Sequence, residues 1–142
     1  GGVLHLLVNM VTLWSFGRAI IHRIGWPEFL SIYLLTAVGG AVCYALLGRN
    51  DAPMVGASGA LFGLAGVWIC WSYLELRLLG RSTSNILRVL LYLVLYNLVF
   101  WFLLQGRLAW ETHLGGFLAG WCYGWLRGRP EKLSRKRRDE EA

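Results

Sequence analysis

The sequence predicts an all-α protein that crosses a membrane several times. Of its 142 residues, 56% are hydrophobic and 15% are charged, so the chain is more apolar and less charged than an average soluble domain. Apolar segments of helical length follow one another, separated by short polar connections. The eight tryptophans and six tyrosines suit the two membrane–water interfaces. We therefore expect a single, all-α polytopic membrane domain.

The apolar segments define five predicted spans. A helix needs roughly 20 residues to cross about 30 Å of hydrocarbon. The second and fourth segments reach this length, and Pro27 stands just ahead of the second, where a helix start tolerates proline. The third and fifth are shorter, so we expect their outer ends to lie below the bilayer surface, inside the protein. The predicted domain covers residues 1–127, with spans at about 3–21, 29–47, 58–74, 86–104 and 112–126.

The basic residues predict the orientation of these spans. If the chain starts outside, all but two of its 14 Lys and Arg residues fall on the inner side, and the exceptions are Arg49 and Arg107. Such an excess marks the cytoplasmic side of a membrane protein. Residues 128–142 then form a basic, disordered cytoplasmic tail, for which membrane topology is a better explanation than nucleic-acid binding. We expect a multi-pass protein of the bacterial plasma (inner) membrane with no nucleic-acid partner.

The cysteines do not indicate a metal site or a disulfide framework. Their number is odd, no CxxC motif occurs, and Cys43, Cys70 and Cys122 all lie inside apolar segments. We interpret them as small buried hydrophobic residues and expect no metal and no cofactor.

Topology alone places four polar residues at one depth. The first, third and fifth predicted spans all begin on the outer side. His5 and Asn9 lie near the outer end of the first span, Ser58 begins the third, and His113 begins the fifth. Polar residues from separate parts of the chain are thus predicted to share one level of the bundle.

Glycine stripes predict which spans pack closely. Small residues recur at every fourth position of the third and fifth spans, namely Gly59, Gly63, Gly116, Gly120 and Gly124. Such stripes let two helix backbones approach each other, and packing along them brings Ser58 and His113 to the same end. Glycine stripes occur in membrane bundles of every function, so by themselves they do not identify one.

Ser58 and His113 are the candidate nucleophile and base. A serine hydroxyl needs an adjacent base, and histidine accepts a proton near neutral pH. Taken singly, Ser58 also fits a helix-start residue bonded to its own backbone, and His113 an interfacial histidine. Their shared depth on two glycine-striped spans favours a catalytic pair. No aspartate is placed to complete a triad, so we expect a dyad with the imidazole held by ring packing against Phe62, one turn from Ser58.

His5 and Asn9 are candidate oxyanion donors. Their i, i+4 spacing puts them on one helix face, and amide hydrolysis needs donors aimed at the developing negative charge. The same spacing also suits interhelical hydrogen bonds that hold the bundle together. Asn97, in the middle of the fourth span, is expected to bond between helices.

Three motifs on alternate spans together resemble the rhomboid intramembrane serine proteases. His5-Leu6-Leu7-Val8-Asn9 resembles the HxxxN motif of that family, and Gly56-Ala57-Ser58-Gly59 resembles its GxSG motif. His113-Leu114-Gly115-Gly116, followed by Gly120, resembles the helix of the catalytic histidine. The resemblance covers roughly residues 1 to 127 and implies a rhomboid-like helical bundle with five of the usual six core spans present.

The resemblance implies an intramembrane serine endopeptidase that cleaves transmembrane protein substrates within the lipid bilayer, without metal or ATP. It implies a Ser58–His113 dyad and an oxyanion hole made by His5, Asn9 and the backbone N–H of Ser58. The implied supporting positions are Gly56, Gly59, Phe62, Gly63, Gly116 and Gly120. Many relatives carry tyrosine where this chain has Phe62, which matters little if ring packing is the role. The family's span ahead of His5 is missing from this sequence, so we expect weak or no activity from these residues alone.

Two alternatives belong to other functional classes. The first is a catalytically silent, rhomboid-like module that binds membrane proteins, although such relatives typically lack the serine, the histidine or both. The second is a small transporter that uses His5 and His113 as proton relays, which leaves the GxSG motif unexplained and shows no repeated half. The sequence does not indicate an oligomeric state.

Overall fold

Five helices make up the computed structural model of the chain, which describes residues 3–48, 57–103, 105 and 108–128. Gly56, the loop before Ala57 and the basic tail from Arg129 therefore lie outside the described residues. The helices are α1 (Val3–Ile24), α2 (Trp26–Leu47), α3 (Ser58–Leu78), α4 (Ser84–Leu103) and α5 (Trp110–Leu126). Within these ranges no strand occurs, and the prediction of an all-α bundle is confirmed.

The helices run past several of the predicted apolar segments. α1 continues to Ile24, α2 already begins at Trp26, and α3 continues to Leu78. An apolar segment measures the hydrocarbon that a helix crosses, whereas backbone hydrogen bonding continues into the polar interface, so a helix outlasts its apolar part. Pro27 occupies the first turn of α2, and Gly25 joins α1 to α2 at a φ of 81°, a conformation that favours glycine.

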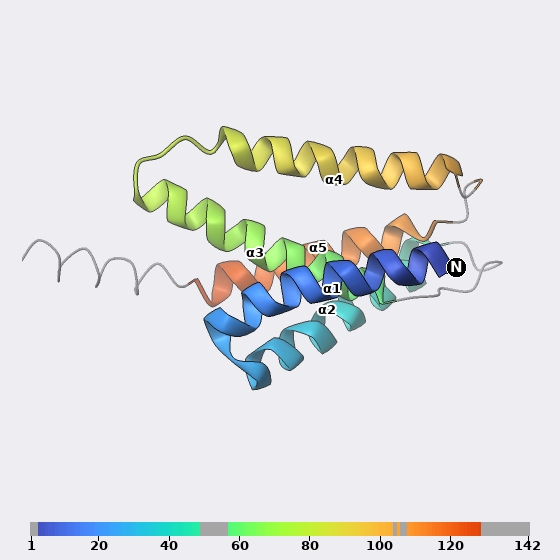
Figure 1. The fold of residues 1–142 in the computed structure, drawn as a ribbon, viewed down its shortest axis with the longest axis horizontal. Helices are drawn as coiled ribbons and strands as arrows, with labels where there is room; N and C mark the ends of the chain where they lie inside the picture. The colour runs from blue at the N-terminus through green and yellow to red at the C-terminus, as the bar shows by residue number, and fades with distance from the viewer. Residues whose placement is uncertain (1–2, 49–56, 104, 106–107, 129–142) are drawn as a thin grey trace, which may run out of the picture.

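α3 is the centre of the bundle. It is packed among α1, α2 and α5, whereas α4 runs along one side, apart from the other four helices (Figure 1). The hydrophobic core forms where α1, α2 and α3 meet, from the buried residues Ile20, Phe29, Ile32, Leu61, Leu64, Val67 and Trp71. Within the described residues, α2, α3 and α4 are each long and apolar enough to cross a membrane. The chain is therefore a multi-pass helical membrane protein.

α3 and α5 meet along the predicted glycine stripes. A methyl group added at Gly116 would overlap the backbone carbonyl of Gly59, and one at Gly120 would overlap that of Gly63. Across α3, a methyl at Gly63 would also overlap the side chain of Thr36 from α2. The prediction of close packing is confirmed, because only glycine lets the two backbones approach this closely.

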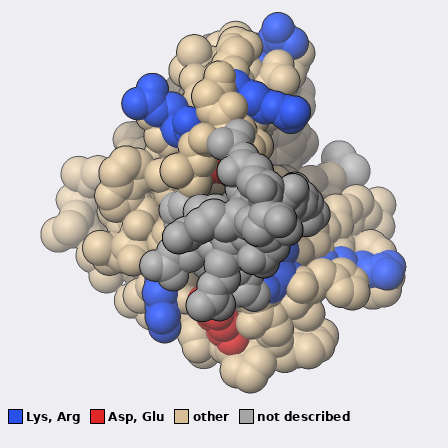
Figure 2. Space-filling view, turned by 90° about the vertical axis from the view of Figure 1, so that its left-hand side faces the viewer, with Lys and Arg blue, Asp and Glu red and all other residues tan. Residues whose placement is uncertain are grey.

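The two ends of the bundle differ in chemistry. α1, α3 and α5 all begin at one end, and Figure 2 shows Lys and Arg side chains gathered around the other. At the basic end, Arg23 of α1 forms an ion pair with Glu75 of α3 at 3.4 Å. Its guanidinium lies over the rings of Trp68 and Trp71, at 5.2 and 5.7 Å from their centroids. These contacts join α1 to α3 there.

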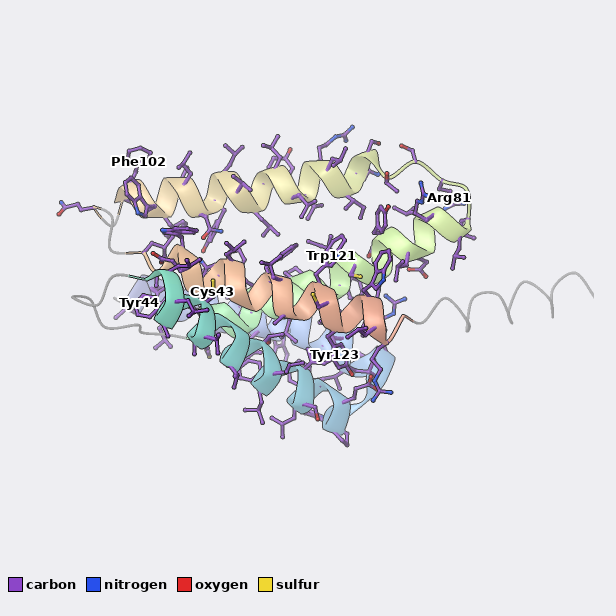
Figure 3. The ribbon with its side chains drawn as sticks, turned by 180° about the vertical axis from the view of Figure 1, so that it is seen from behind. Cys43, Tyr44, Arg81, Phe102, Trp121 and Tyr123 are labelled. Atoms are coloured by element: carbon purple, nitrogen blue, oxygen red, sulfur yellow. The ribbon has the colours of Figure 1, made fainter. Side chains whose placement is uncertain are left out.

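α2 and α5 are joined at the same end. The hydroxyl of Tyr123, which projects from α5 in Figure 3, donates to a carboxylate oxygen of Glu28 at 2.8 Å. Figure 3 also shows Arg81 in the connection between α3 and α4, and Phe102 near the far end of α4, so this helix extends along the bundle. α1 is thus joined to α3, and α2 to α5, at the basic end, away from the polar residues of the sequence motifs.

Candidate active site

Ser58 and His113 meet at one end of the α3–α5 seam, the glycine-lined contact between the two helices, where both helices begin. The Nε2 atom of His113 lies 2.8 Å from Ser58 Oγ, within hydrogen-bonding distance. Ser58 is the first residue of α3 and Ala57 occupies the N-cap position, where no side chain forms a capping hydrogen bond. His113 is 5% exposed, and Ser58 is half-buried. The glycine contacts described above hold the two helices at this separation.

The ring of Phe62 covers one face of the His113 imidazole. The two ring centroids are 4.2 Å apart and the planes are 9° from parallel, which is a stacked arrangement. Phe62 lies one turn beyond Ser58 on α3, so the helix that carries the serine also carries the ring that supports the histidine. The stacking expected from the sequence is present.

Asn97 contacts His113 at Nδ1, the ring nitrogen that does not face Ser58. Asn97 was not predicted to belong to this site. Its Oδ1 atom lies 2.6 Å from His113 Nδ1, and its Nδ2 donates to the backbone oxygen of Leu93 at 3.0 Å. Asn97 does bond between helices, as expected, but its partner is the candidate base. Its position in the middle of the predicted span did not point to this site, although in the structure Asn97 lies within two turns of the end of α4, the same end at which α5 begins.

His5 and Asn9 line a cavity that also contains Ser58 and His113. This cavity has a volume of about 200 Å³ and lies between α1, α3 and α4. Asn9 is 6% exposed, and one of its amide hydrogens is donated to the backbone oxygen of His5 at 2.7 Å. An amide nitrogen carries two hydrogens, so the second is left for another acceptor. The structure therefore gathers the four polar residues that topology placed at one depth.

A second, larger cavity lies on the α4 side of the site. It has a volume of about 580 Å³, and most of its wall is apolar. Asn97 and His113 contribute to its polar part, and Phe62, Leu93 and His113 line both cavities. The rest of the wall comes from α4 and α5, through Leu90, Leu93, Val94, Leu98, Trp101, Trp110, Leu114 and Phe117.

The remaining predicted positions support the seam rather than line the site. Gly59, Gly63, Gly116 and Gly120 are all buried at the contacts between helices, and Gly56 lies outside the described residues. Among the residues that the structure describes, no three His, Cys, Asp or Glu side chains are grouped to hold a metal ion.

Fold and site together define a multi-pass helical membrane bundle with a hydrogen-bonded serine–histidine pair near one end of its central helix. The family model described as the rhomboid domain matches residues 1–130 of the chain. The chain belongs to the rhomboid family, as its motifs indicated.

Named relatives from three kingdoms share this similarity. The chain is 34% identical to "Rhomboid protein 1, mitochondrial" of Saccharomyces cerevisiae over 97% of its own length and 42% of the relative's. It is 32% identical to "RHOMBOID-like protein 5" of Arabidopsis thaliana, covering 89% of the chain and 40% of the relative. It is 29% identical to "Rhomboid protease GluP" of Bacillus subtilis, covering 92% of the chain and 24% of the relative. The chain thus spans less than half the length of these relatives.

Proposed function

We propose that the chain forms the catalytic part of an intramembrane serine endopeptidase, with Ser58 as nucleophile and His113 as general base. The observation that carries the proposal is the 2.8 Å contact between Ser58 Oγ and His113 Nε2. This distance suits proton transfer from the serine to the imidazole as the hydroxyl attacks. The stacked ring of Phe62 supports the proposal, because it limits the tilt of the imidazole.

The chemistry follows from these contacts. Ser58 Oγ attacks the carbonyl carbon of the scissile peptide bond, and its proton moves to His113 Nε2. The tetrahedral intermediate then collapses as the same nitrogen returns the proton to the leaving amine. Water then attacks the acyl-enzyme as His113 Nε2 takes its proton, and the same nitrogen returns the proton to Ser58 Oγ as the bond from Oγ to the acyl carbon breaks and the acid product leaves. Both half-reactions use the same two side chains.

Three groups at or near Ser58 are able to donate a hydrogen bond to an oxyanion. Ser58 is the first residue of α3, and a backbone N–H at that position has no carbonyl partner within the helix. Asn9 retains an amide hydrogen that is not committed to His5, and His5 lines the same cavity. We assign the oxyanion hole to these three groups, since preorganised donors around a developing charge lower the barrier to acyl transfer.

We propose transmembrane segments of other proteins as the substrates. The apolar cavity of about 580 Å³ between α4 and α5 supports this assignment. Its lining is mostly apolar, which suits the aliphatic side chains of a transmembrane segment, and it includes His113. A membrane-embedded substrate would arrive in the plane of the lipid bilayer rather than from water. The catalytic groups proposed here need neither a metal nor ATP.

The proposed location is the bacterial plasma membrane, with the basic end of the bundle in the cytoplasm. The Lys and Arg residues at that end support the orientation. In a variant without its natural cysteines, Gln105→Cys should react with an impermeant thiol reagent added to intact cells, and Ser82→Cys should react only after the cells are opened. The reverse pattern would overturn the orientation.

A serine-reactive fluorophosphonate probe tests the proposed function. The full-length protein in detergent should be labelled, and Ser58→Ala should abolish labelling. Ser31→Ala is the matched control, because Ser31 lies on the exposed side of α2 and donates to Pro27 O. A folded wild-type protein that takes up no label would contradict the proposal, as expected for a silent binding module or a transporter.

A further inference from the structure

The hydrogen bonds of Asn97 fix which way its amide points. Nδ2 donates to the backbone oxygen of Leu93 at 3.0 Å, so Oδ1 faces His113 Nδ1 at 2.6 Å. The flipped amide would direct Oδ1 at a carbonyl oxygen, which cannot donate. The network therefore selects one orientation, with an acceptor facing the imidazole.

An acceptor at Nδ1 determines where the proton of the neutral imidazole resides. A neutral imidazole carries one N–H and one unprotonated nitrogen. Asn97 Oδ1 can only accept, so Nδ1 holds the hydrogen and Nε2 presents its lone pair to Ser58 Oγ at 2.8 Å. The opposite tautomer would donate from Nε2 to the serine and leave two acceptors facing each other at Nδ1. Only the first tautomer can take the proton of the serine.

Asn97 and Phe62 restrain different motions of the ring. Stacking at 4.2 Å fixes the plane of the imidazole, but a half-turn of the ring within that stack would exchange Nδ1 for a carbon. The bond to Asn97 opposes this half-turn. An amide is also suited to the location, because a carboxylate in a membrane-embedded bundle carries a larger desolvation penalty than a neutral acceptor.

We propose that Asn97 is a positioning residue that holds His113 in the Nδ1–H tautomer and thereby keeps Nε2 available as the base for Ser58. This inference rests on the function proposed above and deepens it, since it adds a third residue, on α4, to the serine–histidine pair. Asn97 acts through His113 and needs no contact with the reacting atoms.

The tautomer of His113 is measurable in the wild-type protein. Nitrogen-15 NMR of histidine-labelled protein in detergent distinguishes protonated from unprotonated ring nitrogens, and the His113 signals are assigned by their loss in His113→Gln. We expect a protonated Nδ1 and an unprotonated Nε2 in the neutral ring. A proton on Nε2 overturns the inference. The measurement does not depend on proteolysis, so it tests the tautomer of His113 even if the fluorophosphonate experiment contradicts the proposed function.

Replacing the acceptor gives the second test. Asn97→Leu should convert His113 to a mixture of tautomers and lower kcat about tenfold to a hundredfold, within the range that general-base catalysis contributes, with a smaller change in KM. Asn97→Asp keeps an oxygen acceptor and should retain more turnover than Asn97→Leu. The matched control is Tyr92→Leu, which changes a 65% exposed residue of the same helix outside both cavities. A folded Asn97→Leu protein with wild-type kcat and an unchanged tautomer overturns the inference.

Discussion

α3 and α4 are both apolar helices of membrane-spanning length, yet they occupy opposite environments. Of the most apolar stretch of each helix, 61% is buried in α3 and 6% in α4, although α4 has the higher mean hydropathy. In water the more apolar helix would be expected to be the more buried. In a bilayer the lipid is as apolar as a leucine side chain, so hydropathy does not decide which helix becomes central.

Side-chain size accounts for the difference between the two helices. α3 carries Gly59, Gly63 and Gly66 at its contacts, and the backbone of α5 approaches these positions closely. α4 has no glycine or alanine, and large side chains cover it on every side. α3 therefore forms the rigid seam that carries the serine and contacts the helix of the histidine, while α4 supplies Asn97 and one wall of the larger cavity.

The largest effect is expected at the end of the α3–α5 seam. Ser58→Ala and His113→Ala should each lower cleavage of a membrane-anchored reporter roughly a thousandfold or more, and the double variant should be no worse, because nucleophile and base act as a unit. Turnover is measured in vesicles beside a melting curve for each variant. Appreciable turnover by a well-folded Ser58→Ala protein would exclude the serine mechanism.

The seam itself gives the next largest effect. Gly120→Ala places a methyl group against the Gly63 carbonyl, whereas Gly124→Ala on the same stripe meets the Cys70 side chain at 3.0 Å. We expect Gly120→Ala to lower the free energy of unfolding by about 1–3 kcal/mol, and a shift of about 1 Å at the site to lower turnover roughly a hundredfold.

The same substitution at Gly124 should have a smaller effect, because its methyl group would lie 3.0 Å from the Cys70 Cβ atom and 3.3 Å from the Val67 carbonyl oxygen, whereas at Gly120 it would overlap the Gly63 carbonyl. Unfolding in detergent and reporter cleavage measure the two consequences. Equal losses from Gly120→Ala and Gly124→Ala would show that the seam does not depend on the close approach of the two backbones.

α1 should give an effect on rate of similar size. Asn9→Ala removes one proposed oxyanion donor, and loss of one such donor typically costs about 3 kcal/mol of transition-state stabilisation. We expect a large fall in kcat with little change in KM, while the Ser58 backbone N–H preserves part of the activity. The opposite result, normal turnover with a lowered melting temperature, would assign Asn9 a purely structural role through its bond to His5.

The smallest effect is expected on the lipid-facing side of α4. Leu91 is 55% exposed and lines neither cavity. Leu91→Val should change the free energy of unfolding by no more than about 0.5 kcal/mol and leave turnover unchanged. Thermal unfolding in the same detergent checks this, and a loss similar to that of Gly120→Ala would remove the contrast between the two helices.

Much of the arrangement could be predicted from the sequence, because in a membrane it follows from a few strong constraints. The alternating direction of the spans predicted that Ser58 and His113 lie at the same end of the bundle. The glycine periodicity predicted the contact between α3 and α5. The position of Phe62, one turn from Ser58, predicted its stacking on the imidazole. Each inference needed only the helical repeat and the direction of each span.

The role of Asn97 could not be predicted in the same way. A single asparagine in an apolar segment has many helices available as partners, and no spacing motif links it to His113. Its contact depends on the rotation of α4 about its own axis, and with α4 covered by large apolar residues the sequence does not set that rotation. The helices also extend beyond several of the predicted apolar segments, because composition marks the hydrocarbon boundary and not the last backbone hydrogen bond.

The ion pair between Arg23 and Glu75 holds α1 at the basic end of the bundle, and His5 lies near the opposite end of the same helix. At 1.5 Å per residue, Arg23 is about 27 Å along the helix from His5. A tilt of α1 by about 2° about Arg23 therefore moves His5 sideways by about 1 Å. Trp68 and Trp71 lie against the same guanidinium, and their indole rings restrict that rotation at its origin. A small change in the orientation of α1 at Arg23 thus becomes a larger displacement of His5 at the other end of the helix.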